Sequence, residues 1–252
     1  MTSETLALII LFAILAQIAV YLLFRYYRPK REYQDLKAGV GEAVTATVQP
    51  SNPLPATPVS AELAPAWEGF RDFVVQHRMM EDGAQSICSF YLVPVDGQPL
   101  PSFKPGQFLT FRLLIPDPVT GEAKNVVRCY SLSDRPSPDY YRVTIKRLPP
   151  PVDPPNVPPG VSSNFFHAHV QVGTRLSVKA PAGHFYLMEE EPLPVVLVAG
   201  GIGLTPMLSI VNTMLHVGNP REVWLFYGVR NGAEHVMKEH FEALAKVHPN
   251  FH

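Results

Sequence analysis

The first hydrophobic pattern along the chain is a continuous apolar run at residues 5–24, which carries no charge and one strongly polar side chain, Gln17. Twenty helical residues at about 1.5 Å each span about 30 Å, the thickness of the hydrocarbon core of a bilayer. Four arginine and lysine residues lie at positions 25–31, whereas only Glu4 precedes the run. The pattern predicts a transmembrane anchor over residues 1–34 with the rest of the chain in the cytoplasm. A cleaved signal peptide is the alternative, although it would need a basic start and a shorter apolar core.

The next pattern change separates a tether from a β-rich domain. Residues 35–66 are rich in alanine and proline and show no sustained period, which predicts a linker. Residues 67–191 contain short β-branched and aromatic runs separated by turn residues, and we expect strands at 70–77, 86–93, 107–115, 126–132, 140–148 and 175–180. This pattern predicts an antiparallel β-barrel. A helix that begins at Ser162 or Ser163 and includes His169 should interrupt it.

Residues 192–252 have the pattern of a parallel α/β lobe. A continuous apolar strand at 195–199 precedes a glycine turn, a helix at 206–216, a second apolar strand at 223–227 and a helical stretch at 234–247. Strand, helix and strand in this order form a right-handed βαβ unit. Only one complete unit is present, so the sequence predicts a doubly wound nucleotide-binding lobe that is incomplete.

Charge and cysteine content exclude several classes of function. The net charge is −1, which gives no basic field for nucleic acid. Cys88 and Cys129 are the only cysteines, too few for a disulfide framework or an iron–sulfur cluster. His167 and His169 are two residues apart on a predicted helix, where they point about 200° away from each other and cannot share a metal from one face.

Two motifs carry candidate chemistry. Residues 201–206 place Gly201 and Gly203 between the apolar strand and the helix, where free backbone N–H groups can bind a phosphate. A tight turn without a ligand remains the alternative. At the end of a predicted strand, Arg128 and Tyr130 project from one face. An arginine fork beside an aromatic ring suits a pyrophosphate next to a flat ring system, although an ordinary surface strand could carry the same residues.

The order of motifs decides between these interpretations. The chain contains, in sequence, PGQF at 105–108, RCYS at 128–131, TIKR at 144–147, GVSSN at 160–164, APAGHF at 180–185 and GIGLTP at 201–206. This order resembles the ferredoxin–NADP reductase superfamily, and most of all the reductase part of flavohaemoglobins and of oxygenase reductases. The sequence departs from the family in a proline-dense loop at 149–159 and in stopping before further strands that relatives carry.

The resemblance implies FAD as cofactor and NADH or NADPH as hydride donor. It implies FAD contacts for Arg128 at the pyrophosphate, for Cys129 in the same motif, and for Tyr130 and Ser131 beside the reacting flavin ring. Further FAD contacts are implied for Phe108, Thr144, Lys146, Ser163 and Asn164. The nicotinamide nucleotide is expected at Gly201, Ile202, Gly203, Leu204, Thr205 and Pro206.

Two functions follow from this resemblance. The first is a membrane-anchored oxidoreductase that passes electrons to a one-electron acceptor, which could be a quinone, a haem protein or an iron–sulfur protein. The second is a membrane-tethered flavin-binding module without reductase turnover. Arg230 could bind the 2′-phosphate of NADPH or be an ordinary loop arginine, so the choice between NADH and NADPH stays open.

Overall fold

The computed structural model describes residues 66–117, 120–151, 157–188 and 191–252, all within one compact unit, Ala64–His252. The predicted membrane anchor, and all of the predicted linker except Ala66, lie outside the described residues. In the part of the chain that is described, no helix is long and apolar enough to cross a membrane.

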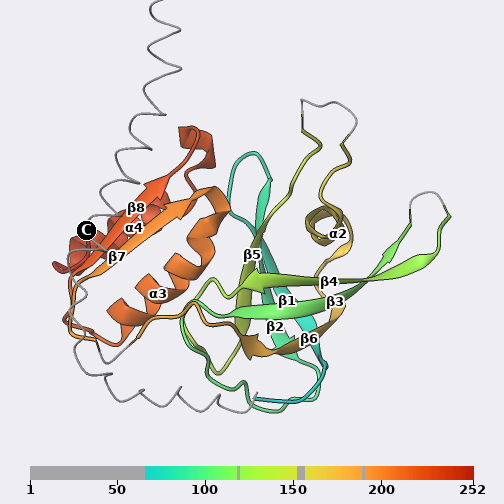
Figure 1. Ribbon diagram of the computed structural model, residues 1–252, viewed down its shortest axis with the longest axis horizontal. Helices are drawn as coiled ribbons and strands as arrows, with labels where there is room; N and C mark the ends of the chain where they lie inside the picture. The colour runs from blue at the N-terminus through green and yellow to red at the C-terminus, as the bar shows by residue number, and fades with distance from the viewer. Residues whose placement is uncertain (1–65, 118–119, 152–156, 189–190) are drawn as a thin grey trace, which may run out of the picture. The chain divides into compact units, whose positions relative to one another are not determined.

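Six antiparallel strands form the barrel (Figure 1). They are β1 (Arg71–Met80), β2 (Ile87–Pro94), β3 (Phe108–Pro116), β4 (Ala123–Ser131), β5 (Tyr141–Lys146) and β6 (Arg175–Ala182). Their order in the sheet is β4-β3-β6-β1-β2-β5. A bridge between Leu132 and Val143 joins the two ends of this order and closes the sheet. The predicted antiparallel barrel is thereby confirmed.

Alternation along the strands explains the barrel core. In β3, Leu109, Phe111 and Leu113 are buried while the residues between them are more exposed, as the two-residue period of a strand requires. Phe166 of α2 (Val161–His169) is fully buried and packs edge-on against Phe90 and Phe111, with ring centroids 5.2 and 5.3 Å away. The helix therefore covers one end of the barrel and fills it with the aromatic ring of Phe166.

The helix α2 begins one to two residues earlier than predicted. Its N-cap is Gly160, which makes no side-chain capping bond, rather than Ser162 or Ser163. Both serine hydroxyls are used elsewhere: that of Ser162 accepts a hydrogen bond from Tyr130, and that of Ser163 contacts the preceding loop. The expectation of a serine cap was wrong because these long-range partners compete for the hydroxyls.

The second lobe is a βαβ unit followed by further helical turns. Parallel strands β7 (Val195–Gly200) and β8 (Val223–Gly228) are connected by η1 (Gly201–Gly203) and α3 (Leu204–His216), which lies against the sheet (Figure 1). The helix begins two residues before the predicted start. The last predicted helix is two elements, η2 (Gly232–Glu234) and α4 (Lys238–Val247), since Met237 at φ +60° interrupts them.

Candidate functional site

Strand β4 presents the RCYS motif at the edge of the barrel. Among the described residues, β4 pairs only with β3 along its length. Arg128 is exposed, and its Nη1 donates to the carbonyl of Val127 at 2.7 Å. No described carboxylate forms an ion pair with it. A guanidinium with N–H donors to spare on an open strand edge can bind a diphosphate.

Tyr130 is fixed between the barrel core and α2. Its ring packs against Phe111 and Phe166, with centroids at 5.8 and 5.2 Å, and its hydroxyl donates to Ser162 Oγ at 3.0 Å. Burial raises the pKa of Tyr130, while the bond to Ser162 and the charge of Arg128 act in the opposite direction. The phenol therefore stays protonated near neutral pH and holds the ring in one orientation.

Ser131 and Phe108 face each other at the end of the β3–β4 pair. The Phe108 ring lies directly over Gly183, where a Cβ would come within 2.7 Å of Phe108 Cε1. Gly183 also has φ +115°, which other residues rarely adopt. The glycine of the APAGHF motif therefore lets the backbone just after β6 pack against the ring of Phe108. The exposed Cys129 lies between these residues and Arg128, with its Sγ 3.4 Å from Thr110 Oγ1.

The side chains of Ser163 and Asn164 bind the two ends of the loop that precedes α2. Ser163 Oγ accepts from the backbone N–H of Leu148 at 3.3 Å, and Asn164 Nδ2 donates to the carbonyls of Leu148 and Gly160 at 2.7 Å each. These bonds set the position of the helix N-terminus. The N–H groups of the first turn, which have no intrahelical partner, are the groups left to meet an anion.

The two expected FAD contacts on β5, Thr144 and Lys146, lie in different environments. Thr144 is 5% exposed, and its hydroxyl lies in a network with Ser89 (2.7 Å) and Ser133 (2.8 Å). Its side chain is therefore structural, and a ligand contact could come only from its backbone. Lys146 Nζ instead forms an ion pair with Glu234 Oε2 of the second lobe at 3.0 Å.

The glycine turn between β7 and α3 is open. A Cβ added at Gly200, Gly201 or Gly203 would meet no atom within 4 Å, so a ligand can approach this backbone closely. The hydroxyl of Thr205 donates to the carbonyl of Ile202 at 3.2 Å and closes the turn. Leu204 anchors the start of α3 in the lobe core, and Pro206 follows within the first turn.

After β8, Glu234 lies at the centre of a group of charged residues that the sequence patterns did not predict. Glu234 accepts from Arg230 through both carboxylate oxygens, at 2.6 and 3.2 Å, as well as from Lys146. The bonds from Arg230 and then from Lys146 lower the pKa of Glu234. Tyr227 lies at the carboxyl end of β8 with a buried hydroxyl that has no partner among the described residues. Ligands of parallel sheets bind at this end of the strands, which is the signal that could have identified Tyr227.

Asp134 connects the barrel to the α/β lobe. Its carbonyl accepts from Ser209 Oγ at 2.7 Å, and its carboxylate accepts from Asn212 Nδ2 at 2.9 Å. Both partners belong to α3. The same carboxylate lies 3.5 Å from Arg142 Nη1. No local pattern identifies Asp134 as this connection, because its two partners on α3 are more than seventy residues away in the sequence.

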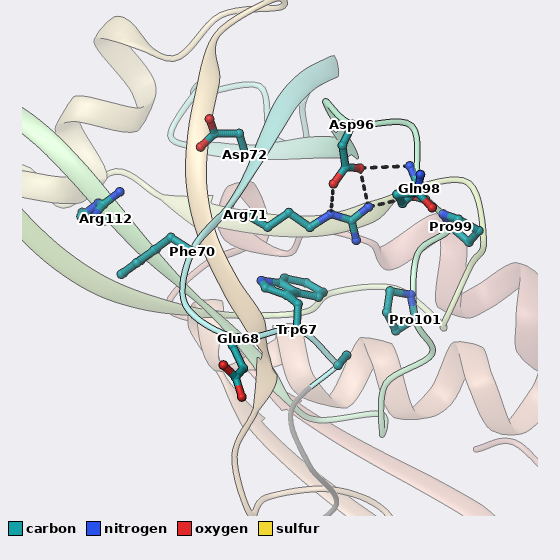
Figure 2. A pocket seen from close by; sticks show the side chains of 11 residues that line it. Trp67, Glu68, Phe70, Arg71, Asp72, Asp96, Gln98, Pro99, Pro101 and Arg112 are labelled. Carbon is teal, nitrogen blue, oxygen red and sulfur yellow. Dashed lines mark hydrogen bonds and ion pairs between the residues drawn. The ribbon is translucent and has the colours of Figure 1, made fainter.

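A pocket of about 790 Å³ at the start of β1 contains none of the predicted site residues. Figure 2 shows Arg71 pointing at Asp96 above Trp67, and the guanidinium binds both carboxylate oxygens at 2.6 and 2.9 Å. Since Asp96 and the carbonyl of Gln98 already satisfy this arginine, the group ties β1 to the loop after β2. We assign it a structural role.

The described residues fit FAD and a nicotinamide nucleotide. An arginine with unused donors and a fixed aromatic ring lie together on β4, and an open glycine turn with an unpartnered buried hydroxyl nearby lies in the second lobe. Residues 197–252 match the family model described as the oxidoreductase NAD-binding domain.

Similar proteins agree with this fit. The chain is 42% identical to a flavohemoprotein of Halalkalibacterium halodurans over 186 residues, which are 74% of this chain and 43% of that protein. The flavohem-like FAD/NAD-binding domain of nitric oxide dioxygenase from Vibrio cholerae is 30% identical, with a TM-score of 0.63, and covers 72% of this chain and 71% of that one. The chain belongs to the flavohaemoprotein-type family of FAD/NAD-binding reductase domains.

The resemblance found in the motifs is thus confirmed at the level of the family. Phthalate dioxygenase reductase is a further similar structure, with 26% identity and a TM-score of 0.54 over 69% of this chain and 48% of that one. As a member of the reductase family, the chain is an NAD(P)H-dependent flavin oxidoreductase module, and FAD and NAD(P)H are its expected cofactors. The chain spans less than half the length of the curated flavohemoproteins it matches.

Proposed function

We propose that this reductase-family chain takes hydride from NADH or NADPH onto FAD and passes the electrons singly to a haem or iron–sulfur partner. Bound FAD would supply both the two-electron acceptor and the one-electron donor. The observation that carries the proposal is that the exposed RCYS strand and the open glycine turn belong to one compact unit. Within this unit, Asp134 connects the barrel to α3, the helix that follows the glycine turn.

The roles of the residues follow from their geometry and from the family. Arg128 would bind the diphosphate with its unused N–H donors, and the N-terminus of α2 would add backbone donors. Tyr130 would pack on the flavin ring, in the orientation that its bond to Ser162 fixes. Ser131 would lie at the reacting edge of the ring. No general base is needed, because a hydride carries its own electron pair and protein side chains serve to position the reactants.

The nucleotide lobe would hold the hydride donor. Its open backbone at residues 201–203 and the N-terminus of α3 suit the diphosphate of a nicotinamide nucleotide. Asp134 would keep α3 in register with β5, so that the two ring systems meet in a defined geometry. A misplacement of about 1 Å would slow the transfer strongly.

Similar proteins support the class of acceptor. One similar structure is described as transferring electrons from pyridine nucleotides to [2Fe–2S], and a flavohemoglobin from Malassezia yamatoensis is described with bound FAD and heme. We extend these partners to the present chain as haem or iron–sulfur acceptors. A quinone is the third acceptor chemistry that the test below covers.

Anaerobic mixing of the FAD-loaded protein with NADH, and separately with NADPH, tests the reductase function. We expect rapid loss of the flavin band at about 450 nm, followed by its return when a haem, iron–sulfur or quinone acceptor is added. A protein that binds FAD but is not bleached by either nucleotide would instead be a flavin-binding module without turnover.

We further propose that residues 5–24 anchor the chain in a membrane with the catalytic body in the cytoplasm. The support is the uncharged run of twenty residues and the basic residues that follow it. Deleting residues 1–34 should move the protein from the membrane pellet to the supernatant after ultracentrifugation. A deleted form that still requires detergent for extraction would contradict the anchor.

A further inference from the structure

A pocket of about 440 Å³ lies beneath α2, against the β1–β2 hairpin. Its lining residues are Arg78, Met80, Ala84, Gln85, Arg147, Asn164, His167 and Ala168. In contrast to the pocket at the start of β1, two arginines and no carboxylate line it. A volume of this size suits a small ligand.

This pocket shares Asn164 with the expected FAD contacts but lies on a different face of α2 from Tyr130. Its three helical residues, Asn164, His167 and Ala168, are spaced three and four positions apart and share one face of α2. Ser162, which binds the Tyr130 hydroxyl, lies two residues before Asn164 and so points about 200° away from it. The RCYS strand and the pocket therefore contact different faces of the helix.

The charge of Arg78 has no carboxylate partner among the described residues. Its three side-chain hydrogen bonds go to neutral acceptors: Cys88 Sγ (3.3 Å), Gln171 Oε1 (2.7 Å) and the carbonyl of His167 (2.9 Å). These bonds orient the guanidinium without neutralising it. A partly buried charge is normally paired, so an anion is the missing partner.

Arg147 supplies a second cation to the same pocket. Its backbone N–H donates to the carbonyl of Ser86 at 2.7 Å, which fixes the residue at the end of β5. Its guanidinium makes no ion pair with any carboxylate that the structure describes. Two guanidinium groups that border one pocket favour a doubly charged oxyanion.

His167 adds an acceptor that selects among oxyanions. The residue is 8% exposed, and its Nε2 bonds the carbonyl of Ile145 at 2.9 Å. Burial lowers the pKa of His167; the charges of Arg78 and Arg147 act in the same direction, whereas the bond to Ile145 and the charge of Asp82 oppose it. The neutral ring must donate from Nε2 to the carbonyl, which leaves Nδ1 as an acceptor, and Nδ1 is buried with no partner among the described residues.

We propose that this pocket binds a phosphate group that keeps one proton. Arg78 and Arg147 bind the charged oxygens, and the remaining hydroxyl donates to His167 Nδ1. Inorganic hydrogen phosphate offers this hydroxyl together with two negative charges, whereas a phosphomonoester offers it only as the singly charged anion. Sulfate has the same shape and charge as hydrogen phosphate but no hydroxyl, so it would leave the buried nitrogen unsatisfied.

Calorimetric titration of the FAD-loaded protein at constant ionic strength tests the site, with inorganic phosphate, glycerol phosphate and sulfate as probes. We expect one saturable phosphate site, at least tenfold tighter for phosphate than for sulfate. The variant Arg147→Gln should weaken phosphate binding at least tenfold, whereas Arg175→Gln, which removes an exposed arginine on β6 outside the pocket, should leave it unchanged. Whichever of the two phosphate probes binds more tightly identifies the natural source as a free anion or an ester.

Chemical modification gives a readout that does not depend on the affinity. Phosphate should protect Arg147 from phenylglyoxal, measured by peptide mapping, and should leave the modification of Arg175 unaffected. Absence of saturable binding, equal affinities for phosphate and sulfate, or equal binding by Arg147→Gln and the unmodified protein would each overturn the proposal. Binding that is lost on Arg230→Gln instead would place the anion in the nucleotide lobe and would overturn it as well.

Discussion

The substitution Asp134→Ala tests how the barrel and the nucleotide lobe are held in register. The carboxylate accepts from Asn212 (2.9 Å) and Tyr140 (3.1 Å) and pairs with Arg142 at 3.5 Å. The side chains of Asp134 and Arg142 are 15% and 10% exposed, so solvent screens the pair only partly. Removing one partner of a buried pair costs about 3–5 kcal/mol. We expect a loss near the lower limit, about 3 kcal/mol of unfolding free energy.

Of the bonds that the Asp134 carboxylate accepts, only the one from Asn212 comes from the other lobe. A hydrogen bond to a charged group contributes about 1.5–3 kcal/mol. The Ser209 bond to the backbone carbonyl of Asp134 survives the substitution. We therefore expect Asp134→Ala to retain FAD but to be reduced by NAD(P)H at least tenfold more slowly, because α3 is less firmly placed.

Urea unfolding monitored by tryptophan and flavin fluorescence measures the stability, and anaerobic stopped-flow absorbance measures the reduction. Asp139→Ala is the matched control, since this aspartate lies in the same loop and is exposed. An Asp134→Ala protein that differs from the control by less than about 0.5 kcal/mol and is reduced at the same rate would refute the proposed connection between the lobes.

Three further results are expected. Arg128→Ala should weaken FAD binding by about 1.5–3 kcal/mol, seen as flavin lost on dialysis, whereas Arg175→Ala should retain its flavin. Gly183→Ala should lower the melting temperature more than Gly173→Ala, because both glycines have positive φ but only at Gly183 would the Cβ meet an aromatic ring of β3. Glu234→Gln should be less stable than the unmodified protein at neutral pH, and the difference should disappear as the pH falls through the depressed pKa of Glu234, below the ordinary carboxylate range. A difference that grows on acidification would have the wrong sign.

The barrel and the βαβ unit could be predicted because local patterns specify them. Alternating apolar positions and turn residues located all six barrel strands to within a few residues, and the continuous apolar runs at 195–199 and 223–227 identified the parallel pair. The helix starts were less accurate. At α2, the hydroxyl of Ser162 binds Tyr130, which is thirty-two residues away, so it is not available as a cap.

In the candidate site, too, the local motifs could be predicted from the sequence and the contacts between the lobes could not. The motifs predicted that Arg128, Tyr130 and Ser131 lie at the end of a strand and that the glycine turn follows a strand, and the structure has both placements; the contacts of these residues with FAD and the nucleotide stay predictions. The motifs could not show that Lys146 binds Glu234, because that pair joins two lobes across eighty-eight residues. The same holds for Asp134. Contacts between lobes depend on how finished elements pack, which no local pattern contains.

The most direct test of the central claim is anaerobic stopped-flow reduction of the FAD-loaded protein with NADH or NADPH deuterated at the nicotinamide C4 position. If the β4 edge and the glycine turn form one redox site, flavin bleaching should be saturable in nucleotide and slower with the deuterated donor, since the transferred hydrogen moves in that step. Bleaching no faster than that of free FAD, with no saturation, would contradict the account.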